Sequence, residues 1–362
     1  MNTPGNKRRL IIAGLVLIII ALIKVATFYP AWIEENYSTG VYPKISWFYR
    51  ELFGKAAVSI GDLLYFVAGV FIFIGFVKFV RFVIRRRLRG QNLKNKLAKI
   101  FLIGATVYIF FNLSWGLNYN RLGIAHQLQL DAKEHTVEDL KAITALLLAK
   151  VNEDRIALGE GKVAYPPYAK VFEGAQTAYQ NATRVYPFIK YNVVSVKRSL
   201  YGRMGNFLGF LGYFNPFTGE AQVNLTQPRF LVPFITCHEM AHQLGYASES
   251  EANFVGYMAA TSSADTLFRY SAYFDLFNYA NRELYLKDSI SARENYNHLD
   301  TLVKLDIAEL KAYWKKSNNV IEPFIRVFYD QYLKANQQDK GIKSYNEVVG
   351  WLIAYHKKYK RL

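Results

Sequence analysis

Three long apolar stretches in the first third of the chain constrain its fold more than any other feature. They cover about residues 10–31, 57–80 and 97–115. Each is long enough to cross the roughly 30 Å hydrocarbon core of a bilayer as a helix. A helix buried in a soluble protein keeps a polar stripe, and the stretch Leu10–Ile23 has none. We therefore expect a membrane protein with three N-terminal transmembrane helices in a membrane region over residues 1–116.

The first apolar stretch has two interpretations. Lys7, Arg8 and Arg9 precede it, as in the basic region of a cleavable signal peptide. The apolar run is longer than that of a typical signal, however, and no clear small-residue cleavage site follows Val25. An uncleaved signal anchor is the better interpretation.

The distribution of charge predicts the orientation in the membrane. Residues 1–121 carry 17 Lys and Arg against 4 Asp and Glu, whereas the remainder is nearly balanced. The segment between the second and third stretches has eight basic residues and no acidic one: Arg81, Arg85, Arg86, Arg87, Arg89, Lys94, Lys96 and Lys99. By the positive-inside rule this segment and the N-terminus are cytoplasmic. Residues 117–362 are then extracytoplasmic, in a multi-pass protein of the cell (inner) membrane.

The chain has a high pI of about 9.6, and the position of its basic residues indicates what kind of partner it binds. A basic chain can bind nucleic acid through a basic face. Here the excess charge lies beside the apolar stretches, so the partner we expect is the lipid bilayer, and no nucleic acid. Two charged residues, Lys24 and Asp62, fall inside the stretches. They either form an ion pair or reach the membrane surface independently.

Residues 117–362 are predicted to form a helix-dominated α+β domain. Thr136 with Asp139 is expected to begin an amphipathic helix, and a second helix is expected from about Ala292 to Trp314. Ser344 with Glu347 has the spacing of a capping box for a last helix.

A segment rich in glycine and aromatic residues, residues 200–227, interrupts this helical pattern. It contains a turn signal at residues 215–219 and then alternates apolar and polar residues over Ala221–Leu225. This alternation predicts a hairpin with a half-buried strand. Such a strand either packs within the hairpin or pairs with an extended substrate.

The residues that carry chemistry lie on the next predicted helix, which Pro233 begins and Gly245 ends. His238 and His242 are four residues apart, so both imidazoles leave the same face of the helix and can share one Zn²⁺. Glu239 is adjacent and can act on a water at the metal without binding the metal itself.

A catalytic zinc site usually has three protein ligands, and the third is either Glu249 or Glu251. Ser248 is a good N-cap, and Glu251 three residues later would complete a capping box. That assignment leaves Glu249 free to face the metal, so we favour Glu249. Asn253 lies one turn further on and is expected to support the ligands by hydrogen bonding.

The sequence His238-Glu239-Met240-Ala241-His242, followed by Glu249-Ser250-Glu251-Ala252-Asn253, resembles the zincin metallopeptidases of the gluzincin type. The second run is similar to the Glu-x-x-Ala-Asp motif of membrane peptidases related to the CAAX prenyl protease and heat-shock protease groups. In that motif the first Glu is a ligand, which implies this role for Glu249. The chain departs from the motif by having Asn253 in place of Asp and a shorter gap between the two motifs.

The whole chain more closely resembles an uncharacterised bacterial three-span membrane family, known as a domain of unknown function. The likeness rests on the three apolar stretches, the run Trp115–Tyr119, the HExxHQxG and ExEANF motifs, and the late segment Lys343–Tyr345. It covers nearly the full chain and implies the same site, but no substrate.

Together these features predict a membrane-anchored, zinc-dependent metallopeptidase that hydrolyses extracytoplasmic or membrane-proximal peptides or proteins. Glu239 would be the general base. Two alternatives stay open: a non-catalytic, zinc-stabilised envelope scaffold or receptor, and a zinc amidase acting on a cell-wall amide.

Other residues near the motif are harder to assign from the sequence. Nothing in the sequence selects an oxyanion-stabilising residue among Tyr257, Arg269, Tyr270 and His298. Cys237 is expected to be a small core residue, because its side chain leaves the helix about 100° away from that of His238.

Overall fold

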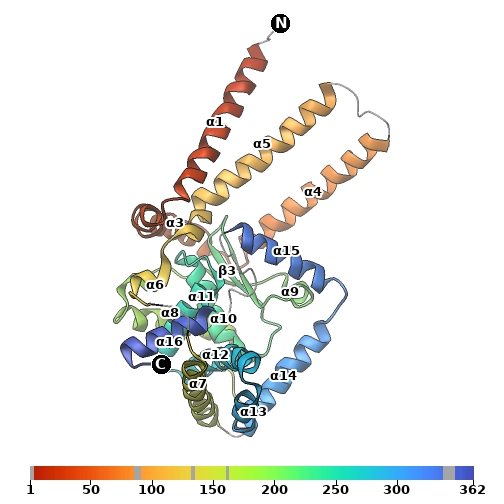
Figure 1. Ribbon diagram of the computed structural model, residues 1–362. Helices are drawn as coiled ribbons and strands as arrows, with labels where there is room; N and C mark the ends of the chain where they lie inside the picture. Colours follow the sequence, from red (N-terminus) through yellow and green to blue (C-terminus); the bar gives the residue numbers. More distant parts are fainter. Residues whose placement is uncertain (1–3, 85–90, 132–134, 160–162, 337–346) are drawn as a thin grey trace.

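Three helices near the N-terminus project away from a helix-rich body (Figure 1). They are α1 (Pro4–Ala26), α4 (Ile60–Ile84) and α5 (Gln91–Ser114). The computed structural model describes residues 4–84, 91–131, 135–159, 163–336 and 347–362. Within these residues, α4 and α5 are long and apolar enough to cross a membrane, and α1 gives a third span if it is counted with the segment after its bend. These helices agree with the predicted membrane region.

The three projecting helices differ slightly from the predicted stretches. The first stretch was expected to continue to residue 31, but α1 ends at Ala26 and the chain bends by 99° before Pro30. Proline disfavours helical geometry in the residue before it, and this explains the break. Of the basic residues that predict the orientation, Arg85, Arg86, Arg87 and Arg89 lie outside the described residues, as do the side chains of Lys7, Arg8 and Arg9.

The two charged residues of the spans do not pair with each other. The carboxylate of Asp62 is buried and accepts hydrogen bonds from the backbone N–H of Leu200 (2.7 Å) and the hydroxyl of Tyr213 (2.6 Å). The ammonium of Lys24 lies 5.9 Å from the centre of the Tyr108 ring. The alternative of an ion pair was therefore wrong, and Asp62 instead joins the start of α4 to the body.

A connector between α1 and α4 is built into the body. It comprises the short helix α2 (Pro30–Trp32), the π-helix η1 (Ile33–Val41) and α3 (Tyr42–Gly54). Glu34 on η1 forms a buried ion pair with Arg121, which follows the 3-10 helix η2 (Gly116–Asn120). A small second core at this junction contains Ile23, Ile33, Tyr37, Tyr42, Trp115, Leu117 and Ala247.

A small sheet lies beside the connector. Its strands are β1 (Val196–Arg198), β2 (Gly212–Asn215) and β3 (Glu220–Val223), in the order β1-β3-β2. β1 runs parallel to β3 and β2 antiparallel to it. The predicted turn is confirmed, because Asn215 ends β2 and its carbonyl accepts a hydrogen bond from the N–H of Gly219.

For the third strand, packing within the hairpin is confirmed, whereas the alternative of pairing with a substrate and the half-buried pattern were wrong. β3 is the central strand, so neither of its edges is open to a substrate. All four of its residues are buried, although an alternating, half-buried strand was predicted. The reason is that its polar face packs against the membrane helices: the carboxylate of Glu220 accepts hydrogen bonds from the N–H groups of Ile60 and Gly61, at the start of α4.

The remainder of the body is helical. Its other elements are α6 (Gly123–Gln127), α7 (Val137–Ala157), α8 (Tyr168–Thr183), η3 (Pro187–Ile189), α9 (Gly202–Leu208), η4 (Arg229–Leu231), α10 (Val232–Gln243), α11 (Glu249–Thr261), α12 (Thr266–Lys287), α13 (Ser289–Asn297), α14 (Thr301–Ser317), α15 (Glu322–Ala335) and α16 (Glu347–Tyr359). The predicted start of a helix at Thr136 is confirmed, since Thr136 caps α7 and forms a capping box with Asp139. The single helix expected over residues 292–314 is two helices, because Asp300 caps a new one. Ser344 lies outside the described residues.

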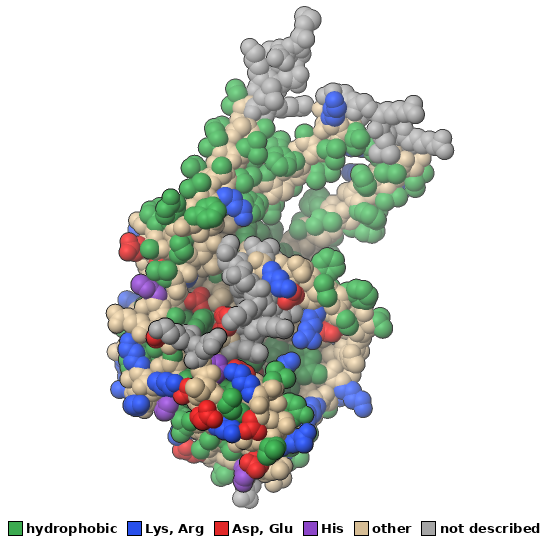
Figure 2. Space-filling view, in the orientation of Figure 1, with side chains coloured by type: hydrophobic (Ala, Val, Ile, Leu, Met, Phe, Trp, Pro, Cys, Tyr) green, Lys and Arg blue, Asp and Glu red, His purple; other side chains and the backbone are tan. Residues whose placement is uncertain are grey.

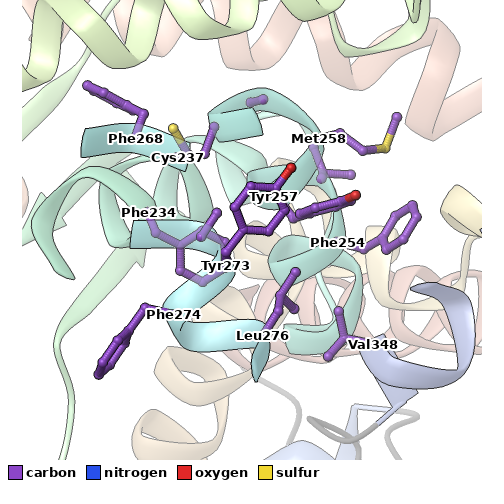
Figure 3. Close-up of a cluster of buried hydrophobic side chains, with 14 of the residues drawn as sticks. Phe234, Cys237, Phe254, Tyr257, Met258, Phe268, Tyr273, Phe274, Leu276 and Val348 are labelled. Atoms are coloured by element: carbon purple, nitrogen blue, oxygen red, sulfur yellow. The ribbon is translucent and has the colours of Figure 1, made fainter. Parts of the chain in front are cut away.

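The main core is formed where α10, α11 and α12 meet (Figure 3). Phe234 and Cys237 from α10 lie here with Phe254 and Tyr257 from α11 and Phe274 from α12, all buried. Gly256 lets α11 come close to α10, since a Cβ there would lie 3.0 Å from the backbone nitrogen of His238. The core thus fixes the two helices that carry the HExxH and ExEAN motifs.

Candidate metal centre

α10 is a buried helix whose C-terminal carbonyl groups are satisfied by the membrane-proximal part of the chain. The hydroxyls of Tyr42 and Ser46 donate to the carbonyl oxygen of Gln243, at 3.0 and 2.6 Å. The indole N–H of Trp115 donates to the carbonyl oxygen of His242 (3.1 Å). Gly245 then ends the helix with a φ of +87°, as predicted. These bonds fix the end of α10 that carries both histidines.

The two histidines are held by hydrogen bonds on one ring nitrogen each. Nδ1 of His238 donates to Oδ1 of Asn253 (2.7 Å), and Nδ1 of His242 donates to the carbonyl oxygen of Tyr246 (2.7 Å). Both Nε2 atoms are thereby left for another ligand. His238, Glu239 and His242 are buried, and one donor atom of each lies within 4.8 Å of the others. This group can hold a metal ion.

Glu249, the favoured third ligand, lies against the same two nitrogens. Its Oε2 is 3.2 Å from Nε2 of His238 and 3.6 Å from Nε2 of His242. Glu251 points elsewhere, and its carboxylate accepts a hydrogen bond from the N–H of Ile124 at the start of α6 (2.8 Å). Ser248 accepts from the N–H of Glu251 as half of the expected capping box, and the other half is replaced by this contact with Ile124.

The electrostatics of the group favour a positive charge between the ring nitrogens. Burial alone would lower the pKa of His238, but its hydrogen bond to Glu249 and the charge of Glu239 raise it to about 9. Burial would raise the pKa of Glu249, but His238 and His242 hold it well below its ordinary value. The carboxylates of Glu239 and Glu249, which raise the pKa of His238, would also attract a divalent cation.

Glu239 has the environment of a general base. Its Oε2 is buried without a hydrogen-bond partner among the described residues. Burial raises the pKa of Glu239 to about 7, although the two histidines oppose the shift. β2 approaches closely, because a Cβ on Gly212 would lie 2.4 Å from Oε1 of Glu239. A carboxylate with a pKa near neutrality can take up and release a proton at physiological pH.

Two residues near the group were not found from the sequence. Burial raises the pKa of Asp275, on α12, to about 7, and the charge of His238 opposes this shift. Tyr329, on α15, donates a hydrogen bond from its hydroxyl to Oε1 of Glu249 (2.5 Å). Both come from helices far from the motif in the sequence, and neither has a local signal that separates it from other acidic or aromatic residues.

The four candidates for oxyanion stabilisation have other contacts. Tyr257 is in the core, and the hydroxyl of Tyr270 donates to Asp306. Arg269 forms an ion pair with Asp154, and His298 bonds the backbone of α13. Tyr329 contacts Glu249 instead, and the side chain of Tyr279 bonds that of Asn253. Cys237 is fully buried, as expected, and burial raises the pKa of its thiol.

The comparisons with known proteins give a family and no activity. A family model described as "Protein of unknown function (DUF3810)" matches residues 37–353. The chain belongs to this family. No curated protein and no solved structure matches it.

The match to DUF3810 covers the connector from Tyr37 onward, both strongly apolar spans and the complete group on α10 and α11. The expectation of an uncharacterised family is therefore confirmed. Because the description of DUF3810 names no activity, the chemistry has to be argued from the site itself.

Proposed function

We propose that the protein is a membrane-anchored zinc metallopeptidase whose site lies outside the cytoplasm. The observation that carries the proposal is the convergence of His238, His242 and Glu249 beside a buried glutamate, Glu239, with a free carboxylate oxygen. The donor set fits zinc, which binds imidazole nitrogen and carboxylate oxygen. Both Nδ1 atoms are already engaged, so the tautomer that presents Nε2 is set by the fold.

His238, His242 and Glu249 would hold the metal, and Asn253 would keep the ring of His238 in place. A bound zinc ion would polarise the scissile carbonyl and make a water acidic enough to attack it. Glu239 would accept the proton of that water and deliver it to the leaving amine. Its raised pKa suits both steps, because the carboxylate must bind a proton and then lose it.

Two further groups fit roles at this site. The hydroxyl of Tyr329 lies at the carboxylate of Glu249 and could donate to the oxygen that becomes negative during attack. β2 has one neighbour, β3, among the described residues, so its other edge could pair with an extended peptide. β2 thus replaces β3 as the substrate-pairing strand.

The proposal is tested by a Glu239→Gln variant of the full-length protein in lipid vesicles. The substitution removes the base and keeps the side-chain volume. We expect zinc content to be unchanged and cleavage of a peptide library to fall by about 10²–10⁴-fold. Zinc with equal cleavage in both proteins, or with none in either, would contradict the peptidase and favour the zinc-stabilised scaffold.

A further inference from the structure

An open apolar groove lies between the first half of α4 and the body. Its volume is about 700 Å³. One wall is formed by α4, with Tyr65, Phe66, Gly69, Val70 and Phe73. These positions extend to 11 residues beyond Asp62, which is about 16 Å along the helix. Since α4 is long and apolar enough to cross a membrane, this wall is itself part of a candidate span.

The opposite wall belongs to the body and includes the strand next to the candidate metal centre. It includes Met204 from α9, Phe210, and Tyr213 and Phe214 from β2. The ring of Phe214 lies 6.5 Å from the ring of His242. The groove therefore joins a membrane span at one end to the strand beside Glu239 and the histidines at the other.

The body is also apolar around this groove. Leu200, Met204 and Phe207, on and just before α9, are each about half exposed. α15, which contacts α9, exposes Phe324 and Phe328 by 69% and 74%. Figure 2 shows hydrophobic side chains over the projecting helices and charged ones mainly over the far end of the body. An apolar face at this end of the body fits contact with the bilayer.

We propose that the groove receives the juxtamembrane end of a transmembrane segment of a peptide substrate. An apolar chain leaving the bilayer along α4 would meet the open edge of β2, where its backbone could pair while alternate side chains enter the groove. A lipid acyl chain could fill the groove but has no backbone groups to pair with β2. That the bound segment is then cleaved rests on the proposed peptidase function. Binding in the groove would restrict the substrates of this peptidase to membrane-anchored peptides.

Two glycines provide a matched pair of variants. A Cβ at Gly69, in the groove, or at Gly104, on α5 outside it, meets no atom within 4 Å. Both sites thus accept a larger side chain without disturbing the helix. Gly69→Trp places an indole in the groove, whereas Gly104→Trp adds the same side chain at a position outside it.

The test measures photo-crosslinking in vesicles of phosphatidylethanolamine and phosphatidylglycerol. The probe is a library of synthetic peptides with one Leu/Ala span, a photo-leucine in its first turn and a randomised polar tail. The protein carries Glu239→Gln so that peptide is not consumed. We expect crosslinks to α4 and β2, a fall of about tenfold with Gly69→Trp because the indole occupies space in the groove, and no change with Gly104→Trp.

Crosslinks elsewhere, no crosslinks, or equal loss in both variants would overturn the inference. So would labelling of the groove by a photoactivatable phospholipid that the peptides do not displace. Failure of the peptidase proposal has a different signature, since the peptides would then crosslink in the groove while wild type and Glu239→Gln show no difference in cleavage.

Discussion

At the scale of single residues, the site depends on which atom of each side chain is already occupied. In both histidines Nδ1 makes a hydrogen bond, which leaves Nε2 for a metal ion. The two glutamates that follow have different partners. Glu249 lies beside the histidines, whereas Glu251 bonds the backbone of α6. These contacts make Glu249 the candidate metal ligand and give Glu251 a structural role.

This division predicts different results for two alanine variants. Glu249→Ala removes a ligand, so we expect the zinc content of the purified protein to fall from about one to well below one per chain. Glu251→Ala leaves the buried N–H of Ile124 without its acceptor, which costs about 1–3 kcal/mol of stability. Its zinc content should be unchanged. Metal analysis together with thermal unfolding separates the two, and the reverse pattern would assign the ligand to Glu251.

The positions of these residues were predictable to different degrees. The spacing of His238 and His242 is a property of one helix, so the sequence alone indicates their shared face. Tyr329 and Asp275 reach the group by tertiary packing of α15 and α12, which no local pattern encodes. Likewise, the polar face of β3 had the appearance of a solvent face because the contact with α4 is non-local.

At the scale of elements, the connector holds the end of α10. Glu34 accepts hydrogen bonds from Arg121, Gly123 and Gln127, and Arg121 donates to the carbonyl oxygen of Gly245, just after the histidines. From the apolar stretches alone, residues 32–56 are simply the segment that connects the first two spans. Its helices instead bury polar groups that fix the candidate metal centre to the membrane region.

Because Glu34 and Arg121 form a buried ion pair, we expect replacement of Glu34 by Gln to lower the free energy of unfolding strongly. Glu34→Gln leaves the guanidinium of Arg121 buried without its counter-charge, at a cost of about 3–5 kcal/mol. As a control on the same connector, Glu51→Gln breaks an exposed pair with Lys55 and should cost less than about 1 kcal/mol. Thermal unfolding in detergent compares the two, and equal effects would contradict a stabilising role of the connector.

The same pair predicts a pH dependence. Burial raises the pKa of Glu34, but the hydrogen bond and charge of Arg121 outweigh it and hold the pKa below its ordinary value of 4.5. A depressed carboxyl pKa stabilises the fold above the ordinary value, and this stability is lost as pH falls through the folded-state pKa. The difference in melting temperature between wild type and Glu34→Gln should therefore be constant near neutral pH and shrink at pH values below about 4.5. A difference that persists in acid would contradict this account.

At the scale of the whole molecule, two helices, or three with the bent pair, are long and apolar enough to cross a membrane and project from one end of the body (Figure 1). The existence of the spans follows from composition and could be read from the sequence. Their attachment to the sheet through Asp62 and Glu220 could not, because these carboxylates bond backbone groups that are remote in sequence.

The orientation predicts a labelling pattern for two introduced cysteines. Leu286→Cys, on an exposed site of the body, should react with a membrane-impermeant maleimide added outside intact cells or spheroplasts. Lys94→Cys, at the start of α5, should react only after permeabilisation. The native Cys237 is fully buried and should stay unlabelled in both cases. Labelling of Lys94→Cys alone in intact cells would place the body in the cytoplasm.

Zinc K-edge X-ray absorption of the purified full-length protein measures whether His238, His242 and Glu249 bind zinc. We predict a shell of nitrogen and oxygen atoms at about 2.0–2.2 Å, two imidazoles among them, and no sulfur. The imidazole signal should persist in Glu239→Gln and disappear in a variant that lacks both histidines. A protein without zinc, or a zinc shell containing sulfur at about 2.3 Å, would contradict the account.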